Sequence, residues 1–118
     1  MKIPKASDAD KEYFRSLFAG DPEITIKPMF GNLGAFVNGN MFAGLFGTTV
    51  GIRLGDEHLT ALRRVQGVGS FGPAERPMTG YAGLPPSWRD ENDLTTMWIL
   101  RAQEYVSALP PKKPRTKR

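Results

Sequence analysis

With 118 residues, of which 40% are hydrophobic and 24% charged, the chain has the size and composition of one globular domain, which excludes a largely disordered protein. It contains no cysteine, so disulfides, thiolate zinc sites and cysteine nucleophiles are excluded as well. The formal net charge is +4, but the last seven residues hold five of the sixteen basic residues and no acidic one. The other eleven basic and twelve acidic residues give the body a charge of −1, which argues against a folded surface that binds nucleic acid.

The amino terminus turns polar before an apolar signal segment can form. The longest apolar runs, such as residues 41–46, are far too short to span a bilayer. We therefore expect a soluble, cytoplasmic protein.

A first helix is predicted after Ser7 and Asp8, because both are common helix caps and Asp10 is favourable in the first turn. Four apolar residues then share one face of this helix: Tyr13, Phe14, Leu17 and Phe18. The segment Gly20-Asp21-Pro22 is predicted to end it.

From residue 23 the apolar period changes to two, which predicts a half-buried strand around Ile24 and Ile26. A turn over residues 31–34 is expected to lead into a second strand over 35–37. Asn38-Gly39 then predicts a type I′ hairpin turn, because both residues tolerate positive φ. Strands over 41–46 and 50–54, separated by a turn over 47–49, complete an antiparallel meander of three or four strands.

Gly55-Asp56 opens a short second helix, whose apolar stripe is Leu59, Leu62 and Val65. Residues 67–86 contain five glycines and four prolines, and we expect only short extended stretches there, at 68–71 and 77–84. A last helix is predicted from Asp90 to Leu109, with an apolar stripe of Leu94, Trp98, Ala102, Tyr105 and Leu109.

The predicted fold class is α+β: an antiparallel β-meander sheet packed with an amino-terminal helix, a short middle helix and a long carboxy-terminal helix. Residues 1–109 form a single domain in this prediction. Residues 110–118 begin with two prolines, which end the helix, and continue as a basic tail with nothing apolar to bury, so we expect this tail to be disordered.

Residues 67–72 spell Gly-x-Gly-x-x-Gly, the dinucleotide fingerprint, but that motif needs a strand before it and a helix after it. Here a predicted helix precedes it and Pro73 follows, so we interpret it as an ordinary helix-to-strand connection. His58 is the only histidine, which we interpret as an exposed side chain. The acidic groups 56–57 and 90–93 precede predicted helices, where carboxylates stabilise the amino terminus. We predict no catalytic residue, cofactor or metal, and no enzyme activity.

The aromatic residues could form a stacking platform for single-stranded nucleic acid. They fall on alternating strand positions or on the inner face of a helix, so we interpret them as core residues: Phe30, Phe36, Phe42, Phe46, Trp88 and Trp98.

The segment Met29-Phe30-Gly31-Asn32-Leu33-Gly34, followed by Asn38-Gly39 and Met41-Phe42-Ala43, resembles the amino-terminal domain of the TfoX/Sxy family of bacterial competence regulators. Further matches in family order extend the resemblance over residues 14–109: Arg53-Leu54, Pro77-Met78, Tyr81, Leu84-Pro85 and Trp98. The positions carried over as structural motif residues are Met29, Phe30, Gly31, Gly34, Gly39, Met41, Phe42, Tyr81 and Trp98. Asn32 replaces the family's usual second glycine, and we do not expect the second, helical domain of the longer regulators.

This resemblance implies an α+β fold and a non-catalytic role in transcriptional regulation, with the cyclic-AMP receptor protein as a candidate partner. We therefore predict a protein-interaction domain whose contact surface is the sheet face or the segment 67–86. The alternative is direct, non-specific nucleic-acid binding, in which Arg63 and Arg64 could assist the tail. The tail residues in that alternative are Lys112, Lys113, Arg115, Lys117 and Arg118.

Overall fold

Five strands and three α-helices follow one another along the chain in the computed structural model, which describes residues 5–29, 31–73, 75 and 77–110. In chain order the elements are α1 (Asp8–Ser16), β1 (Ile24–Met29), β2 (Asn32–Val37), β3 (Asn40–Phe46), β4 (Thr49–Arg53), α2 (Asp56–Arg63), β5 (Tyr81–Gly83), the 3₁₀ helix η1 (Pro86–Asp90) and α3 (Asn92–Ser107). The predicted α+β class is confirmed.

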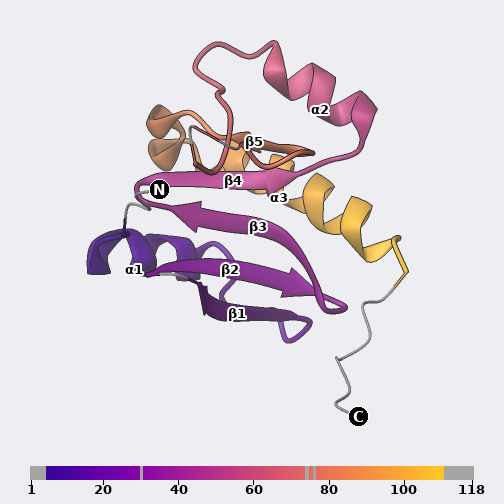
Figure 1. Cartoon of the computed structure of the whole chain (residues 1–118). Helices are drawn as coiled ribbons and strands as arrows, with labels where there is room; N and C mark the ends of the chain where they lie inside the picture. Colours follow the sequence, from indigo (N-terminus) through magenta and orange to yellow (C-terminus); the bar gives the residue numbers. More distant parts are fainter. Residues whose placement is uncertain (1–4, 30, 74, 76, 111–118) are drawn as a thin grey trace.

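The strands form one antiparallel sheet in the order β1-β2-β3-β4-β5, so each strand pairs with the next one in the sequence. Figure 1 shows α1 and α3 behind this sheet and α2 above it. Helix α1 packs against β2 and β3, whereas α3 packs against β2, β3 and β4. We call the side that these helices cover the helix face and the other side the open face.

The turns between the first strands agree only in part with the prediction. Asn38 and Gly39 have φ values of 53° and 80°, as a type I′ turn requires, which confirms the predicted hairpin. The predicted turn over 31–34 is wrong, because β2 already begins at Asn32 and Gly34 pairs with Lys27 inside the sheet. Among the described residues at this corner, Gly31 has the positive φ, 82°.

A β-bulge decides which side chains of β3 face the helices. Ala35 pairs with Ala43 but Phe36 pairs with Met41, so Phe42 is the extra residue. Phe42 is fully buried on the helix face, with its ring 5.6 Å from that of Phe18. The neighbouring Met41 lies on the open face, so adjacent residues serve opposite sides of the sheet.

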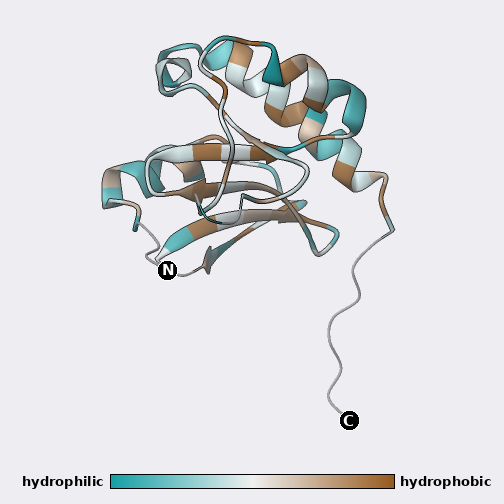
Figure 2. Cartoon of the chain, turned by 45° about the horizontal axis from the view of Figure 1, so that its top comes forward, coloured by the Kyte–Doolittle hydropathy of each residue, from teal (hydrophilic) through white to brown (hydrophobic). Residues whose placement is uncertain are grey.

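The main hydrophobic core lies between the sheet and the helices. Its largest fully buried members are Phe14, Phe42, Leu45, Ile52, Leu62, Val37 and Val106. Trp88 and Trp98 belong to this core, as predicted. The same prediction is wrong for Phe36 and Phe46, which are half-buried on the open face because the sheet alternation directs them away from the helices. Figure 2 shows the strands as largely hydrophobic, whereas hydrophobic and hydrophilic residues alternate along the helices.

The start of α1 is fixed by a capping box. The Ser7 hydroxyl accepts a hydrogen bond from the Asp10 backbone N–H at 3.1 Å, and the Asp10 carboxylate accepts one from the Ser7 backbone N–H at 3.4 Å. Arg89 of η1 adds an ion pair to the same carboxylate at 2.7 Å. This ion pair joins the first helix to the segment that leads into the last one.

The carboxy-terminal half has shorter elements than the sequence predicts. Proline at the first position of η1 starts a separate 3₁₀ turn, and Glu91, with φ −115° and ψ 68°, interrupts the helix, so α3 begins only at Asn92. The extended stretch predicted over 77–84 is only β5, and the one over 68–71 is a single bridge between Gly69 and Gly83.

The end of α3 is held by the hairpin between β2 and β3. The Asn40 side-chain amide donates to the carbonyl of Pro110 at 3.1 Å, and that of Asn38 donates to Ser107 at 3.5 Å. The predicted disordered tail lies almost entirely at 111–118, outside the described residues. Within the described part of the chain, every helix is too short or too polar to cross a membrane.

Candidate functional site

A row of glycines runs across the open face. Gly34 of β2 pairs with Gly44 of β3, Gly44 pairs with Gly51 of β4, and Gly51 pairs with Gly83 of β5. Glycine weakens a strand and commonly marks a place where another group approaches the backbone closely. Three of these four glycines, Gly34, Gly44 and Gly51, lie on central strands and therefore need a physical reason on the open face.

That reason is the side chains that lie directly on the sheet. A Cβ at Gly51 would collide with the ring of Phe71, and one at Gly44 would lie 3.1 Å from the same ring. A Cβ at Gly34 would lie 2.8 Å from the sulfur of Met29 and 3.0 Å from that of Met41. The glycine row thus lets an aromatic ring and two thioethers rest flat on the strands.

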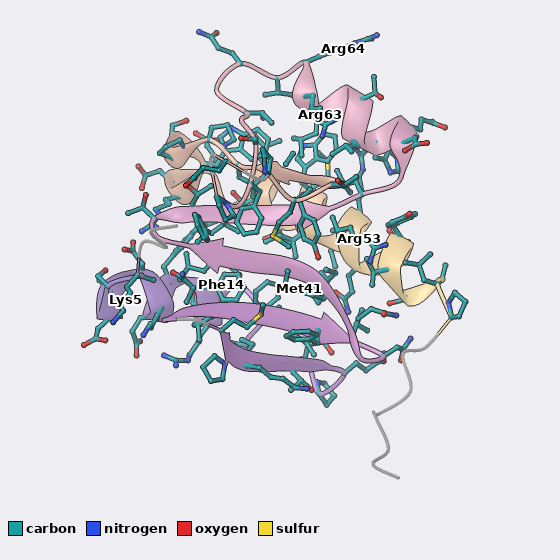
Figure 3. The ribbon with its side chains drawn as sticks, in the orientation of Figure 1. Lys5, Phe14, Met41, Arg53, Arg63 and Arg64 are labelled. Atoms are coloured by element: carbon teal, nitrogen blue, oxygen red, sulfur yellow. The ribbon has the colours of Figure 1, made fainter. Side chains whose placement is uncertain are left out.

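Between these side chains a groove of about 250 Å³ remains open. We call it the methionine groove; its principal residues are Met29, Met41, Gly44, Phe46, Phe71 and Met78. Figure 3 shows Met41 over the middle of the sheet. Asn32 is the one polar residue among the described residues that line the groove, and its side-chain oxygen accepts a hydrogen bond from the Gly47 N–H at 2.9 Å.

One wall of the groove comes from the segment between α2 and β5. Phe71 is buried, stacks on Tyr81 with ring centroids 5.7 Å apart, and meets Phe46 edge-on at 6.2 Å. The Met78 N–H donates to the Phe71 carbonyl at 2.8 Å, which closes this segment into a loop. The segment predicted to be a contact surface therefore forms one site together with the sheet face.

Tyr81 connects this wall to the centre of the sheet. Its hydroxyl donates to the backbone carbonyl of Met41 at 3.0 Å. Burial raises the pKa of Tyr81 to about 12, while the Arg53 guanidinium acts in the opposite direction. The phenol therefore stays protonated at neutral pH and serves as a structural donor rather than as a general base.

The charged residues of the sheet itself are basic. The five strands contain two charged residues, Lys27 and Arg53, and no acidic one. Both lie on the open face, since Lys27 pairs with Gly34 and Arg53 pairs with Tyr81. The Lys27 ammonium lies 5.1 Å from the ring centroid of Phe36. Figure 3 shows Arg53 at the right of the sheet.

Of the other candidate groups, the glycine pattern adjoins the groove through Phe71, whereas His58 lies on α2. Residues 67–72 connect α2 to the open face without a following helix, as the interpretation of the glycine pattern requires. His58 is exposed in the first turn of α2, 6.4 Å from the Trp98 ring. Within the described residues, no three His, Cys, Asp or Glu side chains converge as metal ligands would.

The family-motif residues separate by face. Met29, Gly34, Met41 and Tyr81 gather at the methionine groove, whereas Phe42 and Trp98 lie in the core behind the sheet. Gly31 and Gly39 form the turns at the two ends of β2. Phe30 and the five basic residues of the tail fall outside the described residues.

Sequence reasoning missed the glycine row and the role of Phe71. Glycines at 34, 44 and 51 become a row only when the hairpin register is known, and the bulge at Phe42 shifts that register by one residue. The available signal was the presence of a glycine in the middle of each of three consecutive strands.

Comparison with known proteins gives one clear match. The family model described as the TfoX N-terminal domain matches residues 16–105, which is most of the chain and includes the whole sheet, α2 and most of α3. No curated protein matches the chain.

Proposed function

We propose that this chain, which belongs to the TfoX N-terminal domain family, is a non-catalytic regulatory domain that binds a protein partner through the methionine groove. The family resemblance supports a role in transcriptional regulation, with the cyclic-AMP receptor protein as a candidate partner. The competence role of the bacterial regulators is part of the same proposal.

The observation that carries this proposal is an open apolar groove on a sheet face. Its volume of about 250 Å³ lies below the roughly 300–1,000 Å³ of sites that enclose a small molecule. Methionine side chains are flexible and polarizable, so they adapt to apolar side chains of a partner. The polar groups at the groove, Asn32 and Tyr81, are already engaged with backbone atoms of the chain.

The test is genetic complementation with a matched pair of methionine variants. Transcripts are compared by RNA sequencing after deletion of the gene and its replacement by wild type, Met78→Gln or Met97→Gln. Met78 lines the groove, whereas Met97 is 38% exposed on α3. We expect the deletion to change a defined set of transcripts, which wild type and Met97→Gln restore and Met78→Gln does not.

Melting temperatures of the purified variants serve as the control for folding. If Met78→Gln folds like wild type and restores the transcripts equally well, the groove is not the contact surface. If deletion leaves all transcripts unchanged, the regulatory role itself is wrong.

A second candidate function is non-specific nucleic-acid binding through the tail. The observation in its favour is the composition of residues 112–118, with five basic residues and no acidic one. Arg63 and Arg64 are exposed at the end of α2, which Figure 3 places at the top of the view, whereas α3 ends at the lower right in Figure 1. These two arginines therefore lie at a different part of the molecule from the end of α3.

Fluorescence anisotropy with two unrelated DNA duplexes tests this second function. The intact chain should bind both equally, with a log–log salt slope of roughly −4 to −5 for five phosphate contacts, and a chain without residues 110–118 should lose most of this affinity. Retained affinity after truncation, or a preference for one duplex, would assign the binding to the rest of the chain.

A further inference from the structure

Building on the proposed function, we propose that the methionine groove binds a short acidic amphipathic segment of the partner protein. One apolar side chain of this segment enters the groove. Carboxylates on either side of it pair with Lys27 and Arg53.

The size and lining of the groove support an apolar side chain as the group that enters. A space of about 250 Å³ matches one large or two small side chains rather than a cofactor. Gly44 forms the floor between the terminal methyl group of Met41 and the ring of Phe71, so an incoming group would meet backbone at the bottom and adaptable side chains at the walls.

The charges on the open face indicate which side chains of the partner flank the apolar one that enters the groove. Lys27 is exposed, and its ammonium group lies over the ring of Phe36. The Phe36 ring and the Met41 sulfur both lie close to the position that a Cβ at Gly34 would take. On the other side of the groove, Arg53 pairs with Tyr81, whose hydroxyl binds the backbone of Met41. The two cations therefore flank Met41 from β1 and from β4.

Neither cation is neutralised within the part of the chain that the structure describes. The ion pair found there joins Arg89 to Asp10 behind the sheet, and no carboxylate of the described residues lies within 4.0 Å of Lys27 or Arg53. Opposite charges across an interface fix its register and suppress wrong partners, so two cations beside an apolar groove favour a partner with acidic side chains around an apolar one.

The aromatic rings of the open face are poorly placed to stack on nucleotide bases. Phe71 and Tyr81 are buried and stacked on each other, and the Lys27 ammonium covers a face of the Phe36 ring. Binding of single strands depends on accessible ring faces in a positively charged groove. Phe46 is half-buried and meets Phe71 edge-on, and the methionine side chains of the groove have no ring faces, which favours a peptide over a nucleic acid.

The experiment is selection of short random peptides displayed on phage against the intact chain. Enriched peptides are then synthesised with a fluorophore and titrated by fluorescence anisotropy at low and high salt. We expect an apolar residue flanked by Asp or Glu, with weaker binding at high salt. Charge reversal by Lys27→Glu or Arg53→Glu should weaken binding by about 3- to 10-fold each, because it replaces an attraction by a repulsion.

Arg63→Glu is the matched control, since this arginine is exposed on α2 away from the groove, and it should leave the affinity unchanged. Melting temperatures of the three variants are measured as the control for folding, and we expect them to equal that of wild type. Met78→Gln should weaken binding as well, because it removes an apolar wall.

The outcomes separate this inference from the function on which it rests. Enriched peptides without acidic residues, bound in a way that Met78→Gln weakens but the charge reversals do not, would overturn the inference and leave the proposed interaction surface in place. If no peptide is enriched, or Met78→Gln has no effect on those that are, both fail. If a random single-stranded oligonucleotide bound more tightly than the enriched peptides, and Lys27→Glu abolished that binding, the inference would be overturned in favour of nucleic acid.

Discussion

The two faces of the sheet are built from different kinds of side chain, although the same strands supply both. The helix face carries tightly buried aliphatic and aromatic residues such as Phe42, Leu45 and Ile52, each at most 2% exposed. The open face carries glycines, methionines and two cations, with a groove left between them. A face that served stability alone would have filled this groove, because protein interiors pack to nearly crystalline density.

The bulge at Phe42 makes this division possible within one strand. It places Phe42 and Ala43 on the helix face and leaves Met41 and Gly44 on the open one. The fold thus separates its two tasks by side-chain direction. Changes on the helix face should therefore act on stability, and changes on the open face mainly on binding.

The largest effect is expected on the helix face. Phe42→Ala should lower the free energy of unfolding by about 3–5 kcal/mol, since it leaves a cavity under Phe18 in a fully buried site. Chemical denaturation followed by circular dichroism measures this. A loss below about 1 kcal/mol would mean that the site is not part of the core.

Gly51→Ala should have the next largest effect, although it lies on the open face. The added methyl group collides with the ring of Phe71, and such overpacking costs about 1–3 kcal/mol. Gly69→Ala is the control, because a Cβ there meets nothing within 4 Å and its φ is not in the left-handed region. Equal melting temperatures for the two variants would contradict the placement of Phe71 on the glycine row.

A smaller effect concerns the contact between α1 and η1. Hydrogen bonds from Ser7, and then the Arg89 guanidinium, hold the pKa of Asp10 below its ordinary value of 3.8. A lowered pKa stabilises the folded state at pH values above the ordinary pKa of the group. This stabilisation is lost as the pH falls through the pKa of the folded state.

The unfolding free energy should therefore decrease below about pH 4, and Asp10→Asn should remove that part of the decrease. Because Arg89 is about one-third exposed, the contribution should stay below about 1 kcal/mol. Denaturation curves of both proteins between acidic and neutral pH decide this. Identical pH profiles would show that the ion pair does not contribute.

Much of the fold follows from local signals in the sequence. The capping residue Ser7, the Asn38-Gly39 turn and the alternation of apolar residues in the strands fix most elements in their observed places. The predicted helix start at Asp90 falls at the end of η1, and Glu91 was not recognised as a break, because a 3₁₀ turn and an α-helix share the same residue preferences at this point.

The groove could not be predicted in the same way. It depends on which residues of neighbouring strands lie opposite each other, and a single bulged residue changes that pairing. Phe71 reaches the glycine row from a segment without regular structure, so no periodicity predicts its contact with Gly51. The sequence predicted the open face and the segment 67–86 as separate alternatives, whereas the structure joins them in one site.

The most direct test of the division between the faces compares two adjacent residues, Met41 and Phe42. Met41→Gln and Phe42→Leu are each measured for melting temperature and for restoration of the transcripts that change on deletion of the gene. Met41→Gln should melt within a few degrees of wild type, since its side chain is only half-buried, yet fail to restore the transcripts. Phe42→Leu should melt several degrees lower and still restore them at a temperature where it is folded. If restoration followed the melting temperature in both variants, the open face would have no role of its own, and the account would be wrong.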